Sequence, residues 1–294
     1  MFVPFSIQIV CTPTCLSSGT LSDSALREFV NGLAKSGQGA AYRAKVRELE
    51  RIDLTHAADK AIAYLPRGTT LRARLYLEIK PRSNSFVFTG ADSVPSIFVS
   101  VQLGRSRAQV MNTLAHELHH IGVFAACHHA APMDSSRITP AVATLLDYLT
   151  AFGEGRAMLA AAGGPNVHPH AADDDSIRQR WDRDVSNAPR DMKELSSFFE
   201  SVLDGRIATA DSVTRRGDSY FGVQGPWYTV GWLMASTVER ELGRPALVAT
   251  TCDPVGFLAA YDKAVARAGA RAQLPSWPRS LIERLRLVKR SLQH

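Results

Sequence analysis

The 294-residue sequence contains few cysteines and no long apolar run. Four cysteines are too few for a small domain held together by disulfides; they are Cys11, Cys15, Cys127 and Cys252. Three residues separate Cys11 from Cys15, whereas thioredoxin-like and zinc-ribbon pairs are separated by two. A Cys11–Cys15 bridge is one option, but we expect reduced or incidental thiols. No stretch approaches the roughly 18 apolar residues of a membrane-spanning helix, so we expect a soluble protein without a membrane span.

The N-terminus lacks the basic segment that opens a secretory signal, since the first lysine or arginine is Arg27. No signal is evident, so the default expectation is a cytoplasmic protein. A secreted protein is expected if the true N-terminus lies further upstream. We expect residues 1–20 to form an N-terminal segment without fixed structure.

A basic stripe with interleaved aromatic residues is also missing. The formal charge at pH 7 is +6, but lysines and arginines are spread along the chain with acids between them. We therefore expect no nucleic-acid partner. Hydrophobic residues make up 45% of the chain and charged residues 21%, which is the balance of a globular protein that buries a sizeable core.

The spacing of apolar residues predicts an α+β fold that is mostly helical with one small sheet. Residues 21–64 have a helical pattern that begins with capping residues at Ser22 or Ser24. Residues 70–103 alternate between apolar and polar side chains and are rich in β-branched and aromatic residues, which predicts a mixed or antiparallel sheet. Strands are expected at residues 71–80, 85–90 and 95–103, and further helices at residues 106–125, 139–164, 190–205, 227–243 and 254–294, the last broken at 274–278.

The segment LAHELHHIG, residues 114–122, places histidines and a glutamate inside a predicted apolar helix. His116 and His120 are four residues apart on one face, so both imidazoles can reach one divalent ion. Glu117 projects beside them and can act as general base toward a water molecule that the metal activates. Two imidazoles and a carboxylate suit zinc, and burying these groups without a metal would be costly. His119 points away from the shared face. We interpret it as solvated or as a residue that contacts the metal ligands without binding the metal.

A third ligand is expected further along the chain. The metzincins carry a third histidine six residues after the second, but that position is Ala126 here, which excludes this class. Glu154 is the best candidate, because it is an acid on a helix otherwise lined by alanine, leucine, phenylalanine and methionine. Asp147 lies about two helical turns earlier, could share the same face, and is the runner-up.

Two other groups of potential ligands are weaker candidates. Cys127, His128 and His129 come at the end of the helix that carries the motif and would have to fold back by more than a turn to reach the metal. His168 and His170 lie in a proline-containing loop, and we expect them at the surface.

The motifs IFVSVQL, LAHELHHIG, FGEGRAMLA and WYTVGWLMA, in this order, resemble those of the gluzincin metallopeptidases. They are more closely similar to small zinc-dependent peptidase families with a downstream Glu-Gly-x-Ala signature. The similarity covers roughly residues 70–265. It implies that His116, His120 and Glu154 hold one catalytic Zn²⁺ and that Glu117 is the general base.

The resemblance also implies a zincin-like, thermolysin-like fold in which the small sheet packs on the active-site helix. Its edge strand would be residues 96–103, to which an extended peptide substrate could add through main-chain hydrogen bonds. The position at which thermolysin carries an aspartate that supports a histidine is Met158 in this chain. Asn112 or a backbone carbonyl would therefore have to orient the imidazole.

These inferences give one metallopeptidase-like domain over residues 21–294. Residues 21–135 would form a lobe with the sheet and the active-site helix, and residues 136–294 a helical lobe that carries the third ligand. Tyr228, just before a predicted helix, is our candidate donor to the developing oxyanion, with Trp227 as its rival. The predicted function is a zinc-dependent hydrolase, specifically a peptidase that cleaves peptide bonds by a metal-activated water. The alternative is a non-catalytic, zinc-stabilised peptide-binding module.

Overall fold

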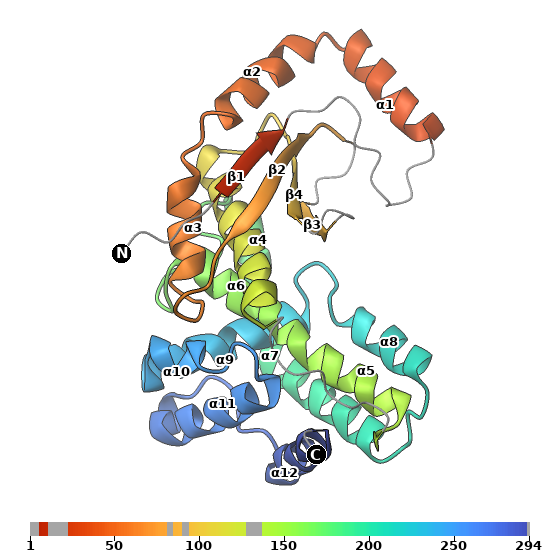
Figure 1. Cartoon of the computed structure of the whole chain (residues 1–294), viewed down its shortest axis with the longest axis vertical. Helices are drawn as coiled ribbons and strands as arrows, with labels where there is room; N and C mark the ends of the chain where they lie inside the picture. The colour runs from red at the N-terminus through yellow and green to blue at the C-terminus, as the bar shows by residue number, and fades with distance from the viewer. Residues whose placement is uncertain (1–5, 11–22, 81–84, 90–93, 128–136, 293–294) are drawn as a thin grey trace.

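Figure 1 shows the computed structural model of the chain, which describes residues 6–10, 23–80, 85–89, 94–127 and 137–292. Most of these residues are helical, and the strands among them form one small mixed sheet. The predicted α+β class, mostly helical with a small sheet, is confirmed. No helix in the described ranges is both long and apolar enough to cross a membrane.

The sheet is built, in the described part of the chain, from β1 (Ser6–Val10), β2 (Arg72–Glu78), β3 (Phe86–Thr89) and β4 (Pro95–Ser100). The order across the sheet is β1-β2-β4-β3, in which β1, β2 and β4 are parallel and β3 runs antiparallel to β4. Within residues 1–20, for which we expected no fixed structure, residues 6–10 form β1, and the others lie outside the described residues.

The inner position of β4 shows that the prediction of residues 96–103 as the sheet edge is wrong. The ring of Phe98 stacks on Tyr76 of β2, with centroids 4.8 Å apart, and on Phe86 of β3, with centroids 5.0 Å apart. These aromatic pairs across neighbouring strands stabilise β4 between β2 and β3. Pro95 indicated an edge strand, but as the first residue of β4 it removes only one donor from the ladder. The edge on this side of the sheet is β3.

One of the N-terminal helices packs against the helix that carries the histidines. The predicted helical region 21–64 forms three short helices, and the third begins at the N-cap Asp53, whose carboxylate accepts a backbone N–H. This third helix packs along the histidine-carrying helix, which also contacts the sheet (Figure 1). The four are α1 (Asp23–Lys35), α2 (Gly39–Leu49), α3 (Leu54–Ile62) and α4 (Arg107–Cys127).

One face of α4 is buried in the core beneath the sheet. Leu114, Leu118 and Ile121 recur at helical spacing and are buried. Gly122 lets α4 lie close to the side chain of Leu65, because a Cβ at this position would lie 2.1 Å from a methyl carbon of Leu65. This packing fixes the rotation of α4 about its axis, and therefore the direction of its polar face.

In the described C-terminal half of the chain, all elements of secondary structure are helices, joined by turns and loops. The single helix predicted for residues 139–164 is instead two helices joined by a 3-10 turn. Phe152, at the end of this turn, packs edge-on against the buried rings of Phe199, Trp227 and Trp277, which places the break in the helix there. The elements are α5 (Pro140–Leu149), η2 (Thr150–Phe152), α6 (Gly153–Ala162), α7 (Asp175–Leu203), α8 (Ala210–Ser219), α9 (Pro226–Leu242), α10 (Arg244–Val248), α11 (Pro254–Ala268), η3 (Gly269–Arg271) and α12 (Arg279–Ser291).

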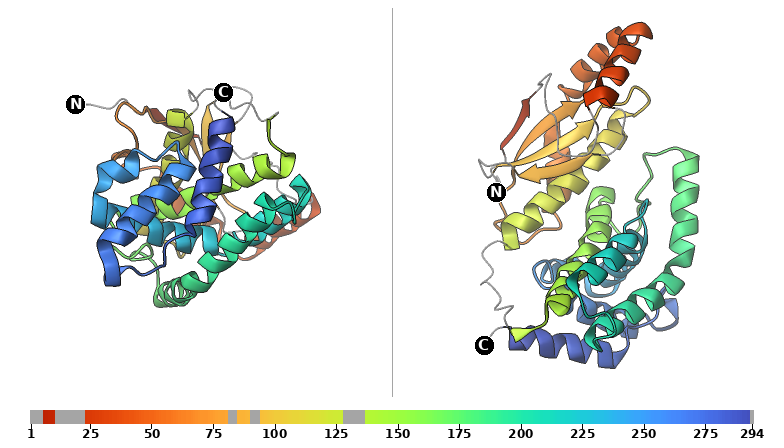
Figure 2. Two further views of the ribbon diagram at one scale, coloured as in Figure 1. Left: turned by 90° about the horizontal axis from the view of Figure 1, so that it is seen from below. Right: turned by 90° about the vertical axis from the view of Figure 1, so that its right-hand side faces the viewer.

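The described residues form two hydrophobic cores, one under the sheet and one among the later helices. The right view of Figure 2 shows the sheet and α4 stacked above the helical part. Helix α6 contributes to both cores, with Ala161 in the first and Leu159 and Ala160 in the second. It is therefore held rigidly between them, next to α4.

A disulfide joins the two parts of the molecule. Cys127, the last residue of α4, is bonded to Cys252, 125 positions later, in the turn between α10 and α11. The expectation of reduced or incidental thiols is wrong for this pair, because the fold brings the end of α4 beside that turn. Cys11 and Cys15 lie outside the described residues.

Candidate metal centre

The structure brings His116, His120 and Glu154 together from two helices. The Nε2 atoms of His116 and His120 lie 3.0 Å apart, and Glu154 Oε2 lies 3.2 Å from the first and 3.3 Å from the second. Zinc binds nitrogen and oxygen ligands at about 2.0–2.1 Å, so neighbouring ligands of a tetrahedral site are about 3.3 Å apart. Two imidazole nitrogens and a carboxylate oxygen that face one point also lack donors among themselves unless one of the Nε2 atoms carries a hydrogen. The donor set and its spacing therefore fit one zinc ion.

The position of Glu154 depends on a close crossing of α6 and α9. Glu154 lies in the first turn of α6, directly after the turn that ends at Phe152. A Cβ on the next residue, Gly155, would lie 2.0 Å from the backbone nitrogen of Trp232 and 2.2 Å from the carbonyl carbon of Gly231. Only a glycine lets the two backbones come this close. The Gly of the Glu-Gly-x-Ala signature thus brings α6, and its glutamate, against α9.

Arg156 holds the same turn of α6 against residues 247–251. Its buried guanidinium donates to the backbone carbonyls of Thr250 (3.0 Å) and Leu247 (3.1 Å) and to the hydroxyls of Thr250 and Thr251. These bonds tie α6 to the C-terminal end of α10, where unpaired carbonyls favour a cation. Arg156 was not among the residues predicted from the sequence; an arginine on a helix whose other residues, apart from Glu154, are small and apolar is the signal that could have revealed it.

Glu154 and the histidines are strongly coupled electrostatically. Burial acts to lower the pKa of His120, but the negative charges of Glu154 and Glu117 outweigh it and raise this pKa above its ordinary value. Burial acts to raise the pKa of Glu154, but His120 and His116 hold it well below the ordinary value. Glu154 is therefore a carboxylate at neutral pH and can act as an anionic ligand.

Glu117 and Tyr228 lie at the edge of this group. Glu117 is half-buried on α4, and its charge acts on both His120 and Tyr228. Tyr228, in the first turn of α9, has its ring nearly parallel to that of His116, with centroids 6.4 Å apart. Burial and the negative charges of Glu154 and Glu117 raise the pKa of Tyr228, so its phenol keeps the proton that a donor needs.

Trp227, the rival donor, is turned away from the metal ligands. It is fully buried among aromatic rings of the second core, and its Nε1 donates to the carbonyl of Gly217 at 2.9 Å. This indole hydrogen is already used in the core, which leaves Tyr228 as the candidate of the two.

Comparison with known proteins identifies the family. Residues 36–270 match the model of the family described as "Putative zinc dependent peptidase (DUF5700)". The chain belongs to this family. Neither the curated proteins nor the solved structures give a match. The region that matches the family runs from α2 to η3 and includes both histidines, Glu117, Glu154 and Tyr228.

Several residues considered from the sequence have other surroundings in this family member. His119 is 1% exposed, so the interpretation of a solvated side chain is wrong; burial holds its pKa well below the ordinary value. Asn112 donates its side-chain amide to the carbonyl of Pro169 at 3.0 Å. Asp147 is exposed on α5 and lines the cavity next to Glu154, outside the group of converging ligand atoms.

The loop after α6 docks on the first half of α4. His170 is buried, against the expectation that it lies at the surface: its Nδ1 is 2.7 Å from a carboxylate oxygen of Asp173, and its ring packs on Trp181. Gln109 of α4 donates to the same Asp173 at 2.9 Å. His168 is half-buried and also pairs with an aspartate, whereas His128 and His129 lie outside the described residues.

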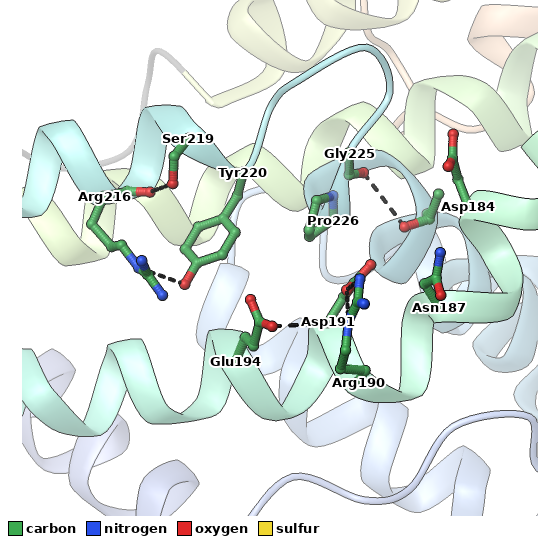
Figure 3. Close-up of a pocket in the computed structure, with 11 residues that line it drawn as sticks. Asp184, Asn187, Arg190, Asp191, Glu194, Arg216, Ser219, Tyr220, Gly225 and Pro226 are labelled. Atoms are coloured by element: carbon green, nitrogen blue, oxygen red, sulfur yellow. Dashed lines mark hydrogen bonds and ion pairs between the residues drawn. The ribbon is translucent and has the colours of Figure 1, made fainter.

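A cavity of about 550 Å³ adjoins the converging ligands. His120 and Glu154 line it, together with residues of α5, η2 and α8. A second cavity of about 320 Å³ lies between α7, α8 and the start of α9 (Figure 3), and none of the converging ligands lines it. The larger cavity is therefore the one positioned to receive part of a substrate.

Proposed function

We propose that this member of the family is a zinc-dependent peptidase of the gluzincin type, in which His116, His120 and Glu154 hold one zinc ion. The observation that carries the proposal is the approach of two imidazole nitrogens and one carboxylate oxygen from separate helices to within 3.0–3.3 Å of one another. A glutamate from a later helix as the third ligand is the gluzincin arrangement, and the family description supports the metal and the reaction class.

The ion, when bound, would supply Lewis acidity that polarises the scissile carbonyl and activates the attacking water. Glu117, one residue after His116, would take a proton from that water and pass it to the nitrogen of the leaving amine. Tyr228 would donate its phenolic hydrogen to the carbonyl oxygen as negative charge develops there. Arg156 and Gly155 would keep Glu154 in place during the reaction, since they fix the turn of α6 on which it lies.

The sheet offers a place for an extended peptide. β3 is an edge strand that packs against α4, and it lies on the side of the sheet nearer the helical part (Figure 1). A peptide that adds to such an edge gains main-chain hydrogen bonds without regard to its sequence. We therefore propose β3, in place of the strand predicted from the sequence, as the strand that aligns the substrate.

Metal analysis and peptide cleavage test this proposal together. The purified chain should bind one equivalent of zinc and cut a mixed peptide library. Glu117→Gln should keep the zinc but lose cleavage by about 10²-fold or more, the contribution of a general base. Glu154→Ala should lose zinc affinity, whereas Asp147→Ala, at the other acid considered as a ligand, should keep it.

The outcomes separate the alternatives. If Glu117→Gln cleaves the library as fast as the unchanged chain, the assignment of the base is wrong. If Asp147→Ala loses zinc and Glu154→Ala keeps it, the ligand set is wrong. If the chain binds zinc and peptide but never cuts, the non-catalytic peptide-binding module is the correct description.

A further inference from the structure

The cavity beside the candidate metal centre has an acidic lining. Its wall carries Asp147 of α5 and Asp218 of α8, while the remaining charged or titratable groups that face it are His120, Glu154 and Tyr148. No lysine or arginine among the described residues lines it, although the chain as a whole carries a formal charge of +6. The lining of this cavity is thus acidic in a chain that is basic as a whole.

The two aspartates differ from two acids of the second cavity in how they are paired. The carboxylate of Asp147 has no hydrogen-bond or ion-pair partner among the described residues, and partial burial raises its pKa. In the second cavity (Figure 3), Arg190 lies 3.0 Å from Asp191 and 3.8 Å from Glu194, so those acids already have a cation. Among the described residues, neither Asp147 nor Asp218 of the larger cavity has a cation as partner, whereas in the smaller cavity this holds for Asp184 but not for Asp191 and Glu194.

Contacts of Tyr148 hold in place the side of the cavity that carries Asp218. The Tyr148 hydroxyl donates to Asp218 Oδ1 at 2.5 Å. The Tyr148 ring rests on Gly217, where a Cβ would lie 2.4 Å from a ring carbon, and stacks on Trp227 at a centroid distance of 6.2 Å. These contacts between α5 and α8 orient the carboxylate before any ligand arrives.

The cavity also has the shape and apolar surface for a long side chain. Its volume of about 550 Å³ is within the usual range of ligand cavities. Ala151 and Phe221 line it together with Thr144, Thr150 and Thr214, so it can cover a chain of methylene groups. Lysine and arginine combine such a stem with a cationic head.

We propose that this cavity binds the lysine or arginine side chain of a peptide substrate, at a residue that flanks the cleaved bond, with Asp147 and Asp218 pairing its charge. This inference rests on the proposed peptidase function, because the scissile bond would lie beside His120 and Glu154, which line the cavity. It narrows the substrate class to basic peptides.

The test compares two peptides that differ at one position, lysine against norleucine, after library profiling with the zinc-loaded full chain has located the cleaved bond. Library cleavage should be enriched for lysine or arginine on one side of the bond. The lysine peptide should be cleaved with a kcat/KM about ten-fold or more above that of the norleucine peptide, the scale of a charge-assisted hydrogen bond.

Variants assign the preference to the two aspartates. Asp147→Asn combined with Asp218→Asn should bring the ratio of the two kcat/KM values close to one. Asp147→Asn alone breaks no hydrogen bond of the described residues, so it should fold, and it should reduce the ratio by itself. Asp184→Asn, in the second cavity, removes the same charge elsewhere and should leave the ratio unchanged.

The results distinguish this inference from the peptidase proposal. Cleavage of many peptides without enrichment for basic residues would overturn the inference and leave the peptidase function standing. A preference that persists in the double variant, or that Asp184→Asn removes equally, would also overturn it. If no peptide is cut at all, both proposals fail.

Discussion

Gly155→Ala tests directly whether the close crossing of α6 and α9 positions the candidate ligand Glu154. The substitution adds one methyl group beside Glu154 without touching any proposed ligand. In the structure that methyl would lie 2.0 Å from the Trp232 nitrogen and 2.6 Å from the Gly231 α-carbon. Because these are backbone atoms of the buried helix α9, no side-chain rotation can relieve the clash.

The magnitude follows from the distance. Ordinary van der Waals contact begins at 3.4 Å, so α6 and α9 would have to part by about 1.4 Å. Overpacking in a core costs about 1–3 kcal/mol, and a clash between two backbones belongs at the upper end, about 3 kcal/mol. Displacement of Glu154 by the same movement should weaken zinc binding about ten-fold or more, the scale seen when groups that support metal ligands are lost.

Two measurements and one control variant test this prediction. Urea unfolding gives the loss in free energy of unfolding, and competition with a chelator gives the zinc affinity. Gly153→Ala is the matched control on the other side of Glu154: it has helical dihedral angles and no atom within 4 Å of an added Cβ. Alanine there should be neutral or stabilise by up to about 1 kcal/mol, with zinc affinity unchanged.

The reasoning is refuted if Gly155→Ala unfolds at the same urea concentration as the unchanged chain and binds zinc equally well. It is also refuted if Gly153→Ala has the same effect as Gly155→Ala, because the loss would then not depend on the helix crossing.

Three further predictions concern the surroundings of the site. Arg156→Met should lower the free energy of unfolding by about 3 kcal/mol, since buried carbonyls lose a charged donor; urea unfolding equal to that of the unchanged chain would contradict this. Replacing Cys127 and Cys252 by serine should cost about 4 kcal/mol, because the bond closes a loop with a sequence separation of 125; stability that does not change in the double variant or on reduction would argue against the bond. Zinc affinity should fall as the pH is lowered, because imidazoles bind metal only when neutral. Glu154 raises the pKa of His120, so this loss should start at a higher pH than for an ordinary histidine, and an affinity independent of pH would contradict the ligand set.

Local sequence patterns determined much of the fold class and part of the candidate site. The helical period alone puts His116 and His120 on one face, since residues four apart are neighbours on any α-helix. An acid on an apolar helix indicated Glu154. Alternation and β-branched residues indicated the strands of residues 72–100, although Arg72–Glu78, Phe86–Thr89 and Pro95–Ser100 are shorter than the predicted strands 71–80, 85–90 and 95–103. Each of these inferences depends only on residues close in sequence.

Only the tertiary structure decided which elements lie next to one another. Helix propensity continues through Thr150, but the aromatic rings that surround Phe152 come from residues 47 to 125 positions later and end α5 there. Stacking of Phe98 between Tyr76 and Phe86 decided that β4 is an inner strand. The pairing of Cys127 with Cys252 and of Arg156 with the end of α10 likewise joins residues about a hundred positions apart. The free energy of such contacts depends on shape and burial across the whole chain, and no periodicity in a short segment encodes it.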